Sequence, residues 1–95
     1  MVMFITRFVV KGEAAQFERL FEEHARYMSS QPGYLGSQLV RSLGDPHTYL
    51  NIGRWRSPDD HRRVVASDQF QQHASQMRAL VDVEAGFYEP VAGEG

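Results

Sequence analysis

The chain contains no cysteine, and this absence excludes several kinds of site at once. Disulfides, iron–sulfur clusters, thiolate zinc sites and cysteine nucleophiles all require that side chain. The thiol content therefore gives no information on the redox compartment. The histidines also lack the spacing of a zinc or iron site, so we expect no metal centre.

Long apolar runs and an excess of one charge are missing as well. No run approaches the about 20 apolar residues of a membrane-spanning helix, and residues 1–10 lack the basic start of a signal peptide. Ten Lys and Arg against twelve Asp and Glu give a net charge of −2, and the basic residues are spread along the chain. Nucleic-acid and anionic-membrane partners require a basic patch, so neither is expected. The expected location is the cytoplasm.

Length and composition are those of one folded domain. The 95 residues are 42% hydrophobic and 23% charged, which predicts a single core over residues 1–95 with a frayed tail at 92–95. A chain of this size fills most of its interior simply to remain folded. A large ligand pocket would need added burial from a partner subunit, so we expect a homo-oligomer.

Hydrophobic periodicity predicts four strands and three helices. Residues 2–10 are β-branched and aromatic, which is typical of a strand. Apolar side chains then recur every three or four residues until Pro32, which indicates an amphipathic helix. Ser57 and Ser67 stand where the N-caps of a short and a longer helix are expected. The remaining predicted strands are residues 34–43 and 48–56, with a turn at 44–47 between them, and residues 82–91.

The predicted order of the main elements is βαββαβ, which is the ferredoxin-like α+β fold. In this fold an antiparallel sheet carries helices on one face only. Side chains alternate along residues 48–56, so Leu50 and Ile52 share one face while Tyr49 and Trp55 share the other. Both faces thus carry large apolar groups. A second sheet from an identical subunit would cover the bare face and give a dimeric α/β barrel.

Asn51 and Trp55 are the first candidates for a functional site. A spacing of four in a strand places them on one face, about 13 Å apart along the strand, and Gly53 leaves a gap between them. A carboxamide and an indole N–H can hold a phenolate or carbonyl oxygen, but neither titrates, so the pair suits charge stabilisation. The alternative is structural: Trp55 is a core residue and Asn51 bonds to a neighbouring loop.

The four histidines are the side chains suited to base catalysis near neutral pH. His73 shares a helical stripe with residues that should face the sheet, so we expect it to point into a cavity under Asn51 and Trp55. His24 has the analogous place on the first helix. His61 and His47 are expected to be more exposed. For each histidine, a structural or surface role is the alternative.

Aromatic residues predict what surrounds a ligand. If about half of the Tyr and Phe rings face inward, they form a cavity that suits a flat polycyclic molecule by stacking. The same rings could equally form only a core. The residues that we expect around the substrate are Tyr34, Tyr49, His61, Phe70 and Met77.

Three short motifs resemble the antibiotic biosynthesis monooxygenase family. They are PGYLGS at residues 32–37, YLNIGRWRS at 49–57 and SDQF at 67–70. The resemblance covers residues 2–91. It implies a homodimer of ferredoxin-like subunits, in agreement with the fold predicted from periodicity.

One branch of that family, the anthrone oxygenases of aromatic polyketide pathways, uses an Asn and a Trp four residues later on the second hairpin strand. Asn51 and Trp55 match that spacing. A Tyr six residues after the Trp is replaced here by His61, and an Arg of the last helix falls near Ser75. The resemblance therefore does not by itself imply the proton relay of that branch for this chain.

A second branch degrades heme with an Asn on the first strand, a Trp in the short helix and a His ligand in the last helix. The corresponding residues here are Thr6, Val64 and Ala74, with His73 one residue out of register. The resemblance to this branch is therefore weaker, and heme is disfavoured as a cofactor unless a helix shift brings His73 into the ligand position.

The resemblance to the anthrone oxygenases implies oxygenation of a phenolic or anthrone-like aromatic polyketide with O₂ in antibiotic biosynthesis, often without flavin, heme or metal. Asn51 and Trp55 would hold the substrate oxyanion, and His73 or His24 would take the proton. Some relatives use reduced flavin from a separate reductase. Two other functions stay open, a heme-binding or heme-degrading protein and a non-oxidative ligand-binding or cyclase-like dimer. A regulatory domain of the kind attached to DNA-binding proteins ranks below both.

Overall fold

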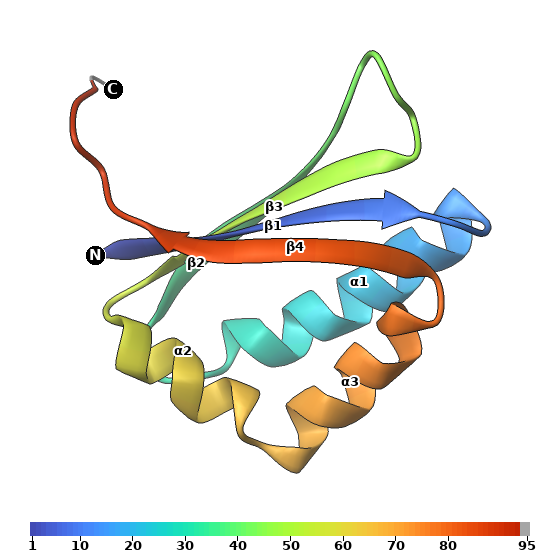
Figure 1. The fold of residues 1–95 in the computed structure, drawn as a ribbon. Coiled ribbons are helices and arrows are strands. Elements are labelled where there is room, and N and C mark those ends of the chain that lie inside the picture. The colour runs from blue at the N-terminus through green and yellow to red at the C-terminus, as the bar shows by residue number, and fades with distance from the viewer. Residues whose placement is uncertain (94–95) are drawn as a thin grey trace.

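A computed structural model describes residues 1–93 of the chain (Figure 1). It confirms the predicted strands and helices, including the short helix that leads into the last one. Residues 94–95 of the expected frayed tail lie outside the described residues. The elements are β1 (Val2–Val10), α1 (Ala14–Ser29), β2 (Tyr34–Arg41), β3 (Thr48–Trp55), α2 (Pro58–Val65), α3 (Asp68–Arg78) and β4 (Val81–Tyr88).

The strands form an antiparallel sheet in the order β2-β3-β1-β4, and the helices lie together against one face of it (Figure 1). This is the ferredoxin-like α+β arrangement that the sequence predicts. β4 is an edge strand and ends at Tyr88, three residues earlier than predicted. Its partner β1 starts only at Val2, and Pro90 has no N–H to donate to a ladder.

Local sequence determines where each helix begins. The side-chain oxygens of Ser57 and Ser67 cap α2 and α3, accepting hydrogen bonds at 3.2 Å from the N–H groups of Asp60 and Phe70. α1 has no such side-chain cap. It is held instead by its apolar face, which packs against the sheet. The buried residues of that face are Phe17, Phe21, His24 and Met28.

Strand register determines which side chains face the helices. Thr6 of β1 pairs with Asn51 of β3, and Phe4 pairs with Gly53. Because directly paired residues share a face, these side chains point with Trp55 toward the helices. The prediction that Asn51 and Trp55 share this face is confirmed. The other face has no helix and exposes Val40, Leu50 and Tyr88 by 38%, 37% and 55%.

The core has two clusters on the helix-covered face. The first, which we call the filled end, consists of Phe8, Val10, Phe17, Phe21, Tyr49, Met77 and Val81. The second is built on Met28, Trp55 and Val64. We call this second cluster, together with the neighbouring His24, Asn51 and Gly53, the cavity end, because the polar part of the cavity lies there. Phe8, Phe21, Met77 and Val81 of the filled end form an apolar border of the same cavity.

Candidate active site

A cavity of about 620 Å³ lies between the helices and the sheet. Strand residues such as Phe4 and Trp55 form its floor, and helix residues such as Met28 and Phe70 form its roof. The volume falls within the about 300–1,000 Å³ of small-molecule sites. Most of the wall is apolar or aromatic, so a flat hydrophobic ligand fits, and the few polar groups on the wall can fix its orientation.

Asn51, Gly53 and Trp55 form what we call the polar notch in the floor of the cavity. A methyl group built on Gly53 would lie 3.5 Å from Nε1 of Trp55 and 3.8 Å from Nδ2 of Asn51. Both nitrogens therefore border the space that the missing side chain leaves open. Oδ1 of Asn51 is buried without a hydrogen-bond partner. The predicted geometry, two N–H donors flanking a gap, is confirmed, and it suits an anionic ligand oxygen.

His24 of α1 lies in the roof of the cavity. Its side chain is buried, and its Nδ1 has no hydrogen-bond partner. Burial, with smaller contributions from His73 and His61, lowers the pKa of His24 from 6.5 to about 4. The ring is therefore neutral at neutral pH. A neutral imidazole on a cavity wall can accept a proton from a bound ligand.

His61 also lines the cavity, and the prediction that it is exposed is wrong: only 6% of its surface is accessible. α2 follows β3 so closely that its first turn lies over the end of the sheet. The imidazole packs between rings, with centroid distances of 4.0 Å to Phe4 and 5.3 Å to both Trp55 and Phe87. Burial, followed by the charge of Arg62, lowers its pKa to about 4.

His73 does not line the cavity, so that part of the sequence prediction is wrong. The roll of α3 turns Phe70, Ala74 and Met77 toward the cavity and leaves His73 at the flank of that stripe. Its ring instead lies 5.8 Å from His24 and 5.4 Å from Tyr27, between α3 and α1. Since Ala74 faces the cavity, α3 offers no imidazole there as an axial heme ligand.

Of the five residues expected around the substrate, four line the cavity and one does not. Tyr34, His61, Phe70 and Met77 line the cavity, as predicted. Tyr49 does not, because α1 covers it directly: its ring packs 5.0 Å from Phe17. Its hydroxyl donates a hydrogen bond to Glu18 at 2.5 Å. His47 is exposed in the hairpin turn, as predicted.

Two polar features of the cavity end were not predicted from the sequence. Thr6 was considered only as the counterpart of a heme-branch residue, yet it lies opposite Asn51 on the cavity floor and is 6% exposed. The second feature is Asp60, which is buried at the start of α2 although it is charged. The Ser57-x-x-Asp60 spacing of a capping box is a signal that would have located it.

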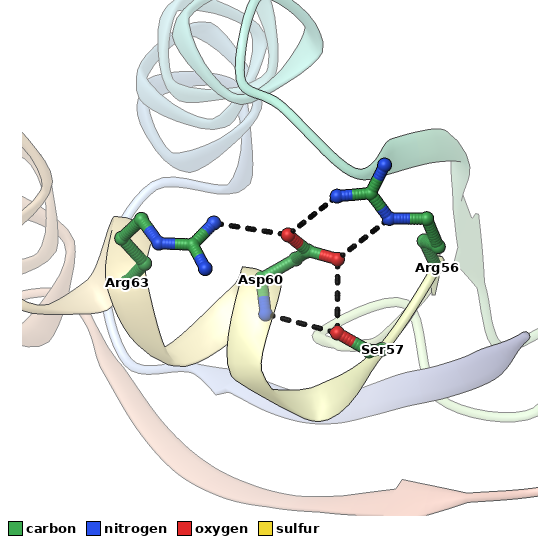
Figure 2. Close-up of polar contacts among 4 residues, drawn as sticks. All are labelled: Arg56, Ser57, Asp60 and Arg63. Carbon is green, nitrogen blue, oxygen red and sulfur yellow. Dashed lines mark hydrogen bonds and ion pairs between the residues drawn. The ribbon is translucent and has the colours of Figure 1, made fainter.

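Asp60 is the centre of a cluster that fixes the turn between β3 and α2, shown in Figure 2. Arg56 donates to its two oxygens at 3.0 Å each, Ser57 donates at 2.9 Å and Arg63 at 3.0 Å. The bonds from Arg56, then those from Ser57 and Arg63, hold the pKa of Asp60 well below its usual range. Arg56, Ser57 and Asp60 lie between Trp55 and His61 in the chain and Arg63 follows His61, so the cluster fixes the segment that carries both rings.

Within residues 1–93, no group of three or more His, Asp or Glu side chains is arranged to hold a metal ion. None of the helices in that part of the chain is long and apolar enough to cross a membrane.

Known proteins resemble this chain in sequence and in fold. The sequence profile described as antibiotic biosynthesis monooxygenase matches residues 1–76. Deoxynogalonate monooxygenase of Streptomyces nogalater is 37% identical over 87 residues, which span 92% of this chain and 74% of that protein. The crystal structure of SnoaB, a cofactor-independent oxygenase from Streptomyces nogalater, superposes with a TM-score of 0.93 at 35% identity, covering 97% of this chain and 94% of that one. The chain therefore belongs to the antibiotic biosynthesis monooxygenase family and is a monooxygenase.

Proposed function

We propose that this monooxygenase oxygenates a phenolic or anthrone-like aromatic polyketide with O₂ in antibiotic biosynthesis, and that it needs no flavin, heme or metal. The observation that carries the proposal is the polar notch, where Trp55 Nε1 and Asn51 Nδ2 border the space over Gly53. The similarity to deoxynogalonate monooxygenase and to the cofactor-independent oxygenase SnoaB supports the reaction class.

Substrate binding follows from the shape of the cavity. The fused rings lie between the apolar roof and the sheet, and one oxygen of the substrate enters the polar notch. There the N–H groups of Asn51 and Trp55 donate to it. Because both donors are fixed in a largely apolar cavity, they stabilise a negative charge on that oxygen more than water would.

Proton removal is assigned to His24. Its ring lines the roof across from the polar notch and is neutral at neutral pH, since burial lowers its pKa to about 4. A neutral imidazole can take the proton from the substrate while the notch holds the resulting enolate or phenolate oxygen. His73 contacts His24 from behind. We therefore assign it the role of a neighbour to the base, not of the base itself.

The oxygenation step needs no external reductant, because the substrate supplies the electrons. The carbanion form of a deprotonated anthrone passes one electron to O₂, and the resulting radical pair joins through a new C–O bond to give a peroxide anion. This anion takes back the proton that His24 removed and becomes a hydroperoxide. Loss of water breaks the O–O bond and leaves a ketone. One oxygen atom enters the substrate as a carbonyl, the other leaves as water, and the CH₂ carbon is oxidised. The protein contributes orientation, exclusion of water and stabilisation of the anion.

The proposal includes a homodimer in the cytoplasm. The sheet face without helices exposes Val40, Leu50 and Tyr88, and a second copy of that face would cover them. Leu50→Glu would place two like charges in such an interface, so we expect it to halve the mass in sedimentation equilibrium. An unchanged mass for this variant, or a monomeric wild type, contradicts this dimer.

Oxygen uptake by the purified protein with an anthrone under air tests the proposed reaction. We expect turnover without added flavin or metal and no inhibition by a chelator. Asn51→Ala and Trp55→Phe should each lower kcat/KM by about tenfold or more, since each removes one donor to the developing anion. Leu43→Ala is the control, because this side chain of the hairpin turn is 104% exposed.

Three outcomes contradict the proposal in different ways. Unchanged turnover in both variants removes the polar notch from the mechanism. Binding of the anthrone without oxygen uptake favours the non-oxidative ligand-binding function. A strict requirement for reduced flavin or heme contradicts the cofactor-independent reaction while leaving the family assignment intact.

A further inference from the structure

The cluster in Figure 2, which we call the Asp60 cluster, lies behind the wall of the cavity. Its members Arg56, Ser57, Asp60 and Arg63 do not line the cavity, so they act on a ligand only through other residues. Asp60 is 3% exposed and is the one buried carboxylate among the described residues. The other ion pairs of that part of the chain each join two exposed side chains. The reaction steps described above give this buried charge no role.

Three segments of the chain meet at the Asp60 cluster. The backbone N–H of Arg56, at the end of β3, donates to the carbonyl of Gly33 ahead of β2 at 2.8 Å. A Cβ on Gly33 would overlap the side chain of Asp60, so the carboxylate lies directly against that glycine. Asp60 itself belongs to the first turn of α2. Each segment continues at the next residue, or at the one before, into a ring on the cavity wall, and these rings are Tyr34, Trp55 and His61.

The three rings contact one another with Trp55 in the middle. The centroid of its indole lies 5.5 Å from the ring of Tyr34 and 5.3 Å from that of His61, both in edge-to-face geometry. Nε1 of the same indole borders the space over Gly53 in the polar notch. The direction of that N–H therefore depends on how β2, β3 and α2 are fixed relative to each other.

We propose that Asp60 is a positioning residue of the oxygenase: by tying Arg56, Gly33 and α2 together, it fixes the angle at which the indole N–H of Trp55 enters the polar notch. This inference rests on the proposed function, because it concerns a donor to the substrate oxygen. A buried ion pair adds little net stability compared with apolar side chains, but it can enforce one arrangement of its surroundings. A donor stabilises a developing anion fully only when it is held within about 0.5 Å of the productive geometry.

Arg56→Gln is the first test, because it removes two hydrogen bonds to Asp60 from a side chain that is 68% exposed. The fold should therefore persist. We expect kcat for an anthrone to fall about fivefold while KM changes by less than about twofold, since the lost alignment matters most in the transition state. Trp55 is the one tryptophan of the chain. Time-resolved fluorescence should show a lower residual anisotropy for its indole, which gains rotational freedom.

Arg26→Gln is the matched control for this variant. Arg26 is also 68% exposed and also pairs with a carboxylate four residues away in the chain, that of Glu22 on α1. It does not line the cavity. We expect kcat, KM and the anisotropy of the indole to remain at wild-type values.

Asp60→Asn in two backgrounds is the second test. The substitution keeps the shape of the side chain and removes its charge, and we expect kcat to fall about tenfold. In Trp55→Phe, which has no indole N–H to align, the same substitution should lower kcat by less than about twofold. A merely structural role would lower kcat by the same factor in both backgrounds. Asp59→Asn is the control, because Asp59 is the adjacent carboxylate of α2 and its side chain is 81% exposed.

Equal factors in the two backgrounds overturn the inference. An unchanged anisotropy in Arg56→Gln also overturns it, and this measurement decides the matter even where Asp60→Asn fails to fold. A wild type that takes up no oxygen with an anthrone contradicts the proposed function instead. In that case an anisotropy that falls in Arg56→Gln and not in Arg26→Gln still supports the positioning of Trp55 by the Asp60 cluster.

Discussion

The filled end and the cavity end lie on the same face of the sheet and share strand β3, yet they treat polar groups in opposite ways. At the filled end, Tyr49 is 3% exposed and its hydroxyl donates to Glu18. Two residues along the strand, Oδ1 of Asn51 is buried without a partner, and so is Nδ1 of His24 above it. The first region has paired its polar atoms within the protein, and the second has not.

This difference suggests that one part of β3 serves the stability of the fold and the other part serves catalysis. An unpaired buried polar atom lowers stability by about 1–3 kcal/mol, so such atoms persist mainly where they serve a ligand. The filled end should therefore control the free energy of unfolding, while the cavity end should control turnover. Substitutions in each region test this separation.

Phe17→Ala should give the largest effect on stability. The ring is fully buried and packs 5.0 Å from both Phe8 and Tyr49. Its removal leaves a cavity in the filled end, so we expect a loss of about 3–5 kcal/mol in the free energy of unfolding, measured by urea denaturation. Leu43→Ala should stay within about 0.5 kcal/mol. A loss below about 1 kcal/mol would show that the filled end is not the main source of stability.

Gly33→Ala tests how the cavity end is held without a filled core. Gly33 has φ +86°, and a Cβ there would overlap Cγ of Asp60, the centre of the cluster in Figure 2. Backbone strain and this overlap together should reduce the free energy of unfolding by about 3 kcal/mol. Gly36→Ala, with φ +149° and nothing within 4 Å, measures the strain alone. Equal losses in the two variants would mean that contact with Asp60 is not important.

The fold was predictable because it depends on patterns with few alternatives. A strand has two faces, so alternation places the side chains of Tyr49, Asn51 and Trp55 on the same face. Once one of them is large and apolar, that face is predicted to be the buried one. Helix starts were predictable from Ser57 and Ser67, whose caps form as expected. The least accurate boundary was the end of β4, which depends on where its partner strand begins.

The site was less predictable, because the rotation of a helix about its axis and the part of the sheet that it covers can take a continuous range of values. His73 and Ala74 differ by about 100° around α3, and only packing against α1 decides which of them faces the cavity. Tyr49 lies on the predicted face of the sheet, but whether it lines the cavity depends on where α1 crosses β3. The burial of His61 results from the short connection after β3, for which the sequence has no periodic signal.

Gly53→Ala tests the cavity end directly. Its Cβ would lie 3.5 Å from Trp55 Nε1 and 3.8 Å from Asn51 Nδ2, which are ordinary contacts, so the fold should tolerate it. The methyl group would occupy the polar notch, and we expect about a tenfold loss of kcat/KM with unfolding free energy changed by less than about 0.5 kcal/mol. Gly44→Ala is the control, because Gly44 is exposed in the hairpin turn and a Cβ there would meet only Oγ of Ser42, at 3.9 Å. Similar activity in both variants would place the reacting oxygen elsewhere.

The smallest effect concerns pH. In the folded chain the pKa of His24 is lowered from 6.5 to about 4, mainly by burial. The unfolded chain therefore binds more protons between these values, so the free energy of unfolding falls as the pH falls through that range. His24→Gln should reduce the loss between pH 7 and pH 5.5 by about 1 kcal/mol in urea denaturation, relative to the wild type and to His47→Gln in the exposed turn.

The same group should set the acid limb of catalysis. If neutral His24 is the base, kcat/KM per folded molecule stays level from pH 8 to about pH 5 and falls only as the ring takes up a proton, with a midpoint near the pKa of about 4. A midpoint near 6.5 would indicate a solvated base and assign proton removal to another group. In that case the role of His24, with its unpaired Nδ1, would be to stabilise the roof of the cavity. The polar notch alone would then distinguish the catalytic end of the sheet from the structural end.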